Sequence, residues 1–142
     1  MLTIVSAVIE HSCRMMFFRH DGRGLPSKKG GVLYLLLAIT LLSRTARDIV
    51  DPAGFSAVSS LLGSLVYVVL ATTLFRPASM AAMLLISLFG NVLMGGLHLA
   101  GISNGYLAIA VLVWEAAALV VVLNKVVRRA QADHKNRKTS NE

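Results

Sequence analysis

Four apolar runs between Gly30 and Val127 constrain this chain more than any other feature of its sequence. A helix of about 20 residues crosses a bilayer core about 30 Å thick. Backbone polar groups must pair with one another inside lipid, so such runs cross the membrane as helices. We therefore expect an all-α integral membrane protein, built as a four-helix transmembrane bundle. Its expected spans cover about 30–50, 54–75, 79–101 and 106–127.

The composition excludes an ordinary water-soluble domain. Hydrophobic residues make up 56% of the 142 residues and charged residues make up 15%, whereas a soluble domain carries about 25% charged residues. A chain of this length has no soluble core large enough for so many apolar side chains. A single membrane domain over residues 30–127 is therefore expected.

The net charge of +7 lies mostly outside the apolar runs, before Gly30 and from Lys125 onward. Basic residues that flank apolar runs set topology and contact anionic headgroups. We expect both termini in the cytoplasm, with residues 128–142 as a basic cytoplasmic tail. A lipid bilayer with anionic headgroups is an expected partner. Nucleic acid is not, because no recognition motif accompanies the charge.

Residues 1–29 are expected to form an amphipathic interfacial helix followed by a basic loop. Ser6, Glu10 and Arg14 recur at four-residue steps, which places them on one face of a helix opposite a broad apolar face. Glu10 and Arg14 also have the spacing of a favourable ion pair. A fifth span in place of the interfacial helix is the alternative.

Glu115 is the most informative polar residue, because a charge at bilayer depth costs about 2.5–3.5 kcal/mol. At about 1.5 Å of rise per residue, Glu115 and Asn91 both fall near the midplane, and His98 shares a helix face with Asn91. We expect a hydrogen bond from Glu115 to Asn91 or to a serine of the second span. The carboxyl is either a neutral group that holds helices together or a proton or cation site.

A second polar cluster lies at the outer end of the first span: Arg44, Arg47, Asp48 and Asp51. Arg44–Asp48 and Arg47–Asp51 are each four residues apart, the spacing of ion pairs on a helix surface. Such pairing would reduce the cost of extending the first span to Val50. This cluster is the second candidate site.

Catalysis finds no support in the motifs. The chain has no HExxH, GxSxG or CxxC motif and no Gly-rich phosphate loop. His98 has no His, Cys or acid three or four residues further on, the spacing that would suggest a metal site. We therefore expect no enzyme, no cofactor and no metal. Compact loops and the lack of a lipidation signal favour the bacterial cytoplasmic (inner) membrane.

Three classes of function remain. The favoured class is a small non-catalytic subunit, or an accessory or assembly factor, of a membrane complex. Such a chain would bind another membrane protein or itself. Its amphipathic start and small-residue helix faces suit this class. The alternatives are a small oligomeric transporter or channel that uses Glu115 as a proton or cation site, and a phage-type holin.

Overall fold

The computed structural model describes residues 2–20, 24–26, 28–51 and 54–139, and the side chains of these residues outside 2–5, 130 and 132–139. This part of the chain holds five helices and no strand, so the expected all-α fold is confirmed. The helices are α1 (Leu2–Met16), α2 (Gly31–Val50), α3 (Ala57–Leu74), α4 (Pro77–Leu99) and α5 (Gly105–Thr139).

Three of these helices are long and apolar enough to cross a membrane: α3, α4 and the Gly105–Arg129 part of α5. The chain therefore has the helices of a multi-pass membrane protein. α2 is 20 residues long, but Arg44, Arg47 and Asp48 interrupt its apolar sequence and exclude it from this group.

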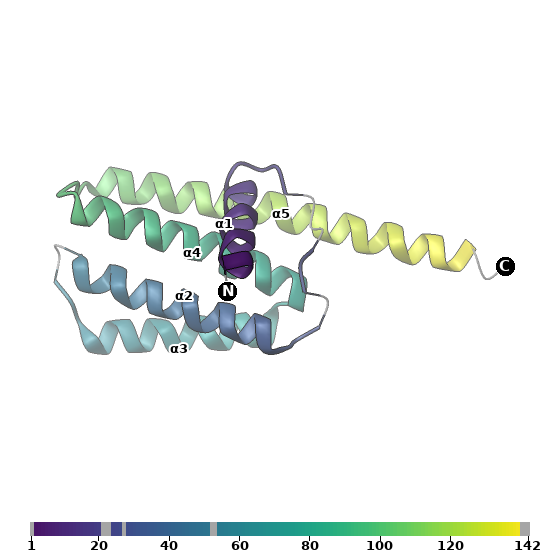
Figure 1. Cartoon of the computed structure of the whole chain (residues 1–142), viewed down its shortest axis with the longest axis horizontal. Helices are drawn as coiled ribbons and strands as arrows, with labels where there is room; N and C mark the ends of the chain where they lie inside the picture. The colour runs from purple at the N-terminus through teal and green to yellow at the C-terminus, as the bar shows by residue number, and fades with distance from the viewer. Residues whose placement is uncertain (1, 21–23, 27, 52–53, 140–142) are drawn as a thin grey trace.

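The long helices alternate in direction and follow one another as a row, in the order α3, α2, α4, α5 (Figure 1). α4 is the central helix and packs against all four others, so 61% of its apolar span is buried, against 11% for α3 and for α5. Within the described residues, α3 and α5 do not contact each other. α3 and α5 therefore lie at the two ends of the row.

The main apolar core lies between α2 and α4. On α2, Leu33, Leu36 and Leu37 recur at three- and four-residue spacing and are buried against α4. On α4, Ala81 and Ala82 are completely buried, and their small side chains let the two helices approach closely. This close contact fixes the registry between the polar residues further along both helices.

The turn between α4 and α5 is tight and depends on glycine. Gly101 has a φ of +76°, a left-handed conformation that glycine adopts without strain. The amide of Ile102 donates to the Leu97 carbonyl at 2.9 Å, and the Gly101 amide to the His98 carbonyl at 3.0 Å. These bonds close the end of α4 in the manner of a Schellman motif. The short turn expected after the third run is thus present, and it sets α5 antiparallel to α4.

α1 lies across the long helices instead of running along them (Figure 1). It buries Ser12, Met15 and Met16 and packs against α4 and α5. Glu10 and Arg14 lie on its exposed face and form the expected ion pair at 2.6 Å. A helix in this orientation, 15 residues long, is not placed as a further span parallel to the others.

The end of α1 is fixed by contacts with α5. Phe18 has a left-handed φ of +58°, which is rare for a bulky residue and costs about 1–3 kcal/mol. Its ring stacks at an angle on Trp114, with 5.2 Å between the ring centroids. Its carbonyl accepts a hydrogen bond of 2.6 Å from Lys125 Nζ, and Trp114 Nε1 donates to the Met16 carbonyl at 2.9 Å. These contacts hold the strained turn against α5.

The helix bounds agree with the expected spans to within three residues at every end except one. α5 does not stop near Val127 but continues as one helix to Thr139, so most of the expected tail is a helical extension beyond the other helices (Figure 1). The side chains of 132–142 lie outside the described part of the chain, as do Asp21–Arg23 of the basic loop.

Candidate functional site

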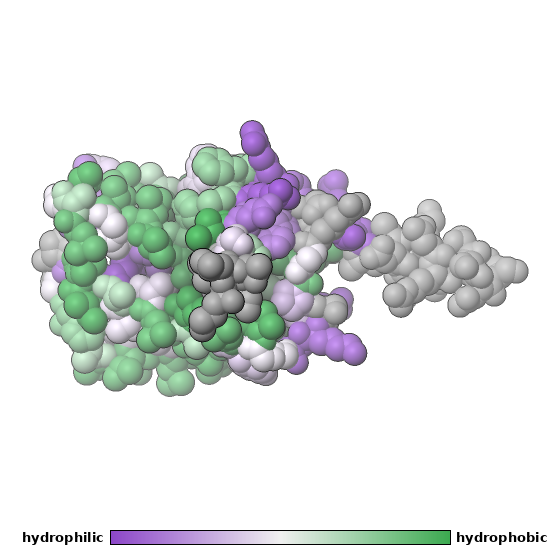
Figure 2. Space-filling model, viewed as in Figure 1, coloured by the Kyte–Doolittle hydropathy of each residue, from purple (hydrophilic) through white to green (hydrophobic). Residues whose placement is uncertain are grey.

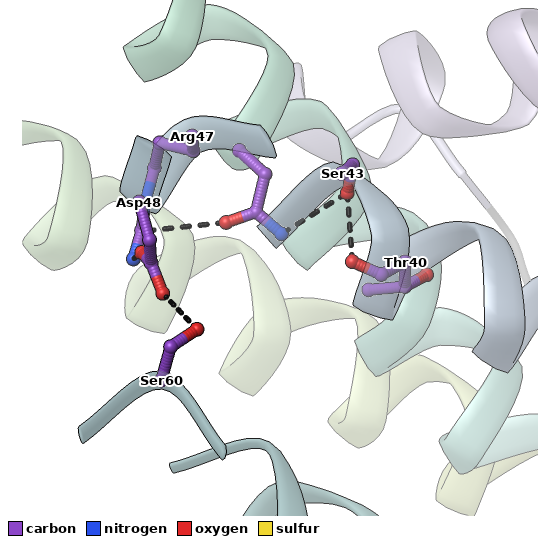
Figure 3. Close-up of polar contacts among 6 residues, drawn as sticks. Thr40, Ser43, Arg47, Asp48 and Ser60 are labelled. Atoms are coloured by element: carbon purple, nitrogen blue, oxygen red, sulfur yellow. Dashed lines mark hydrogen bonds and ion pairs between the residues drawn. The ribbon is translucent and has the colours of Figure 1, made fainter. Parts of the chain in front are cut away.

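A connected set of polar side chains joins α2, α3 and α4 at the level of Arg47 (Figure 3). Arg47 Nη2 pairs with Asp48 Oδ1 at 2.9 Å, and Arg47 Nη1 donates to Asn91 Oδ1 of α4 at 3.1 Å. On the other side, the Ser60 hydroxyl of α3 donates to Asp48 Oδ2 at 2.9 Å. One ion pair on α2 is thus tied to both neighbouring helices.

The same set continues along the contact between α2 and α4. Asn91 Nδ2 donates to Ser43 Oγ at 3.2 Å, and the Ser43 hydroxyl donates to the Thr40 carbonyl at 2.8 Å. The Thr40 hydroxyl lies within 2.8 Å of the Leu36 carbonyl and 3.3 Å of the Leu84 carbonyl of α4. We call Thr40, Ser43, Arg47, Asp48, Ser60 and Asn91 the polar clamp.

The polar clamp is a means of placing charge in an apolar surrounding. A buried charge is costly unless it is paired and hydrogen-bonded. Here the guanidinium of Arg47 faces a carboxylate and an amide oxygen, while the carboxylate of Asp48 also accepts from a hydroxyl. Polar contacts of this kind between helices in lipid stabilise their association by about 0.6–2 kcal/mol each. The clamp therefore holds three helices together.

The expected ion pair between Arg44 and Asp48 was wrong. Within the described chain its ion pair is with Arg47, the adjacent residue, and not with Arg44 one turn earlier. Arg44 instead reaches across to α3, where a Cβ atom on Gly63 would overlap its guanidinium. The reason is that α3 lies beside this turn of α2, and Gly63 leaves room for the long side chain.

Glu115 packs directly on the backbone of α4. A Cβ atom on Gly90 would overlap the Glu115 carboxyl, so a larger residue at position 90 requires the Glu115 side chain to move. The expected hydrogen bond from Glu115 to Asn91 or to an α3 serine does not occur among the described residues. Asn91 points its amide toward α2, where Ser43 and Arg47 engage both of its polar atoms. Gly90, the residue before Asn91, was not identified from the sequence.

A cavity of about 370 Å³ runs from the α4–α5 turn down to Glu115. Its walls come from α2, α4 and α5, and its polar lining includes Arg47, Asp51, His98 and Glu115 from the two predicted sites, together with Asn104. The molecular surface shows polar residues in a recess of the otherwise apolar face at this end of the long helices (Figure 2). The cavity thus brings Glu115 and His98 together with part of the outer-end charge cluster.

His98 projects into this region from the last turn of α4. Its Nδ1 atom is buried and has no hydrogen-bond partner within the described residues. Those residues hold no group of three His, Cys, Asp or Glu side chains arranged to bind a metal ion. An unpaired imidazole nitrogen beside a cavity is a group that water or a small solute can satisfy.

These features belong to a multi-pass membrane protein with an internal ion pair, an embedded carboxyl and a polar cavity. Comparisons with known protein families, with curated sequences and with solved structures give no match. The function must therefore be argued from the geometry of the chain itself.

Proposed function

We propose that this chain is a small non-catalytic membrane protein, acting as a subunit or as an accessory or assembly factor of a membrane complex. The observation that carries the proposal is the unequal packing of the helices. The hydrogen bonds of the polar clamp hold α2, α3 and α4 together, which is a structural role. Meanwhile α3 and α5 leave most of their surface uncovered, and their described residues do not contact each other.

A partner helix would pack on an uncovered face at one end of the row, on α3 or on α5. The uncovered face of α3 carries large apolar side chains, among them Leu61, Leu62 and Leu65, which are 59–70% exposed. Lipid covers such a face equally well in energetic terms, so association in the membrane depends on shape and packing. α3 packs on the other helices along only one narrow strip, so the rest of its surface offers a shape against which a second protein can pack.

We further propose four crossings, with α2 as the additional span and both termini in the cytoplasm. The clamp supports this, because Arg47 and Asp48 neutralise each other and no longer oppose insertion of α2 as separate charges. The excess of basic residues at both ends supports the cytoplasmic side. The bacterial inner membrane is the location we propose.

We propose that α1 lies in the cytoplasmic interface. Ile9 and Cys13 on one flank line an apolar groove with Phe89 of α4, while His11 on the other flank faces the loop at Gly24. Both grooves are lined mainly by apolar side chains, and the support for an in-plane helix is the exposed Glu10–Arg14 ion pair opposite the buried Met15 and Met16.

Site-specific photocrosslinking tests the subunit proposal. A photoreactive amino acid replaces Leu62 on the uncovered face of α3 in the native membrane, and the matched control carries it at Tyr106, which is 85% exposed beside the α4–α5 turn. We expect one defined adduct from Leu62, with a second protein that also co-purifies stoichiometrically in mild detergent. Glu115→Gln should leave this adduct unchanged. Only lipid adducts at Leu62, with a single species in detergent, would contradict the proposal.

A second candidate is a small oligomeric transporter or channel that uses Glu115, and the cavity is the observation that favours it. Its test is proton flux in proteoliposomes that contain the purified chain. Flux that Glu115→Gln abolishes, in a variant that still purifies as the same oligomer, would favour transport. Wild-type vesicles no more permeable than empty vesicles would remove this candidate.

A further inference from the structure

The cavity beside Glu115 reaches the surface at one end of the long helices and stops inside them. Along α5 its wall follows one strip, from Gly105 through Ala108 and Leu112 to Glu115. At about 1.5 Å per residue, that strip is about 15 Å long. One turn further on, Ala118 and then Val122 are completely buried in the apolar core. Among the described residues α2 and α5 do not contact each other, so the cavity is a half-open groove along α4. We call it the shaft: it opens at the α4–α5 turn and along one side, and it ends below Glu115.

Its lining suits water. Asn104 and Ser103 stand at the mouth, with Asp51 and His98 further along the wall and Arg47 and Glu115 deeper in. A water molecule occupies about 30 Å³ of liquid and needs two to four polar partners. The volume of about 370 Å³ holds a chain of waters, and the buried, unpartnered Nδ1 of His98 provides one such partner.

We propose that this shaft is a one-sided water path that brings protons to Glu115 from the α4–α5 end of the molecule. In the reaction a hydronium ion in the shaft transfers its proton to a carboxylate oxygen, so a new O–H bond forms and a neutral water remains. The acid form of Glu115 then carries no charge at bilayer depth. The reverse step returns the proton to the same side, because Ala118 and Val122, completely buried in the apolar core, close the shaft below Glu115 along α5.

The groups around the carboxyl favour a proton over a metal cation. Arg47 from α2 and His98 from α4 line the same shaft, Asp51 follows the end of α2, and Tyr67 of α3 lies within electrostatic reach of Glu115. A hard cation needs about six oxygen ligands, whereas a single carboxyl binds one proton. Arg47 also disfavours a second positive charge nearby.

This inference deepens the second candidate function but does not need transport. A carboxyl can exchange protons with one side in a protein that only assembles a complex. A negative flux measurement does not contradict the shaft, and a negative accessibility result for the shaft does not contradict the subunit proposal.

Cysteine accessibility tests the shaft. In a Cys13→Ser background, single cysteines replace Ala108 and Val111, which line the shaft. Matched controls replace Ile109 and Val113, which do not line it and are 59% and 61% exposed on the surface of α5. A further variant, Ala118→Cys, lies below the closed end. The probe is a membrane-impermeant cationic methanethiosulfonate, added separately to each side of sealed vesicles.

We expect Ala108→Cys and Val111→Cys to react at least about tenfold faster than their controls, because the reactive thiolate forms only where water reaches it. The reaction should occur only from the side of the α4–α5 turn, and Ala118→Cys should stay unmodified from both sides. Equal rates for wall and control positions, or modification from the opposite side, would overturn the proposal. Two wall positions guard against one variant that does not fold.

The carboxyl itself gives a second readout. The infrared carbonyl band of a protonated carboxylic acid, identified by its loss in Glu115→Gln, should respond to pH on the α4–α5 side and not to pH on the other side. A band that follows the opposite side, or both sides equally, contradicts one-sided access even if the cysteine pattern is as expected.

Discussion

At the residue scale, Gly90 and Glu115 determine how closely α4 and α5 approach. The carboxyl occupies the space where any larger residue at position 90 would place its Cβ atom. Glu115 could be recognised from the sequence, because an acid within an apolar run is energetically costly. Gly90 could not be recognised in the same way, because a glycine in a membrane helix is common and only the packing shows that Glu115 lies against it.

We expect Gly90→Ala to destabilise the fold by about 1–3 kcal/mol, the cost of adding a methyl group to a filled site. Gly96→Ala is the control, because a Cβ atom there meets nothing within 4 Å. Shortening the other side chain, in Gly90→Ala with Glu115→Ala, should recover part of the loss. Detergent unfolding followed by the fluorescence of Trp114, the single tryptophan, measures all three. Equal stability of the two single variants would show that the contact does not matter.

The hydroxyl of Ser60 is the polar link from α3 to the ion pair on α2. We expect Ser60→Ala to lower the free energy of unfolding by about 0.6–2 kcal/mol, the range for polar contacts between helices in lipid. Ser64→Ala is the matched control, one turn along α3 and without a hydrogen bond to another helix in the described chain. Unfolding curves of the two variants in the same detergent provide the measurement. A loss at Ser64 as large as at Ser60 would assign the effect to α3 in general.

At the scale of elements, hydropathy alone located the four long helices, because each apolar run must be helical in lipid. It did not reveal which faces meet. The serines and Gly63 of the second run were expected to allow close approach of a helix, and Ser60 and Gly63 do face α2. In contrast, Gly96 and Ala100 form a similar pair yet stay exposed, so small-residue spacing by itself does not identify a contact.

α1 and the turn after it make three specific contacts with α5, one of which is the hydrogen bond from Trp114 to the Met16 carbonyl. We expect Trp114→Phe to keep the ring contact with Phe18 but lose this bond, which contributes about 0.5–1.5 kcal/mol. The detached form of α1 should then rise in population by up to about tenfold. Hydrogen exchange of the α1 amides reports the change. Tyr106→Phe is the control, and the same increase there would argue against a specific anchor.

At the scale of the whole molecule, the charged end of α2 determines the number of crossings. Isolated at the centre of a helix, each Arg or Asp would cost about 2.5–3.5 kcal/mol. Composition therefore separates α2 from the three apolar helices. Pairing was foreseen from the sequence, but with the wrong partner for Asp48, because spacing on one helix cannot show that Asn91 and Ser60 arrive from two others to complete the bonds.

The number of crossings has a direct consequence for the two ends of α2. If α2 crosses, Lys28 and Phe55 lie on opposite sides of the membrane, and if it does not, they share a side. Single cysteines at these positions in the Cys13→Ser background, labelled with an impermeant maleimide on intact cells, decide between these two topologies.

We expect Phe55→Cys to react from outside and Lys28→Cys only after permeabilisation. Arg129→Cys, at the far end of the apolar part of α5, should behave like Lys28→Cys, because an even number of crossings returns the chain to its starting side. Labelling of Lys28→Cys and Phe55→Cys from the same side would instead mean three crossings, with α2 held against the other helices by the polar clamp without spanning.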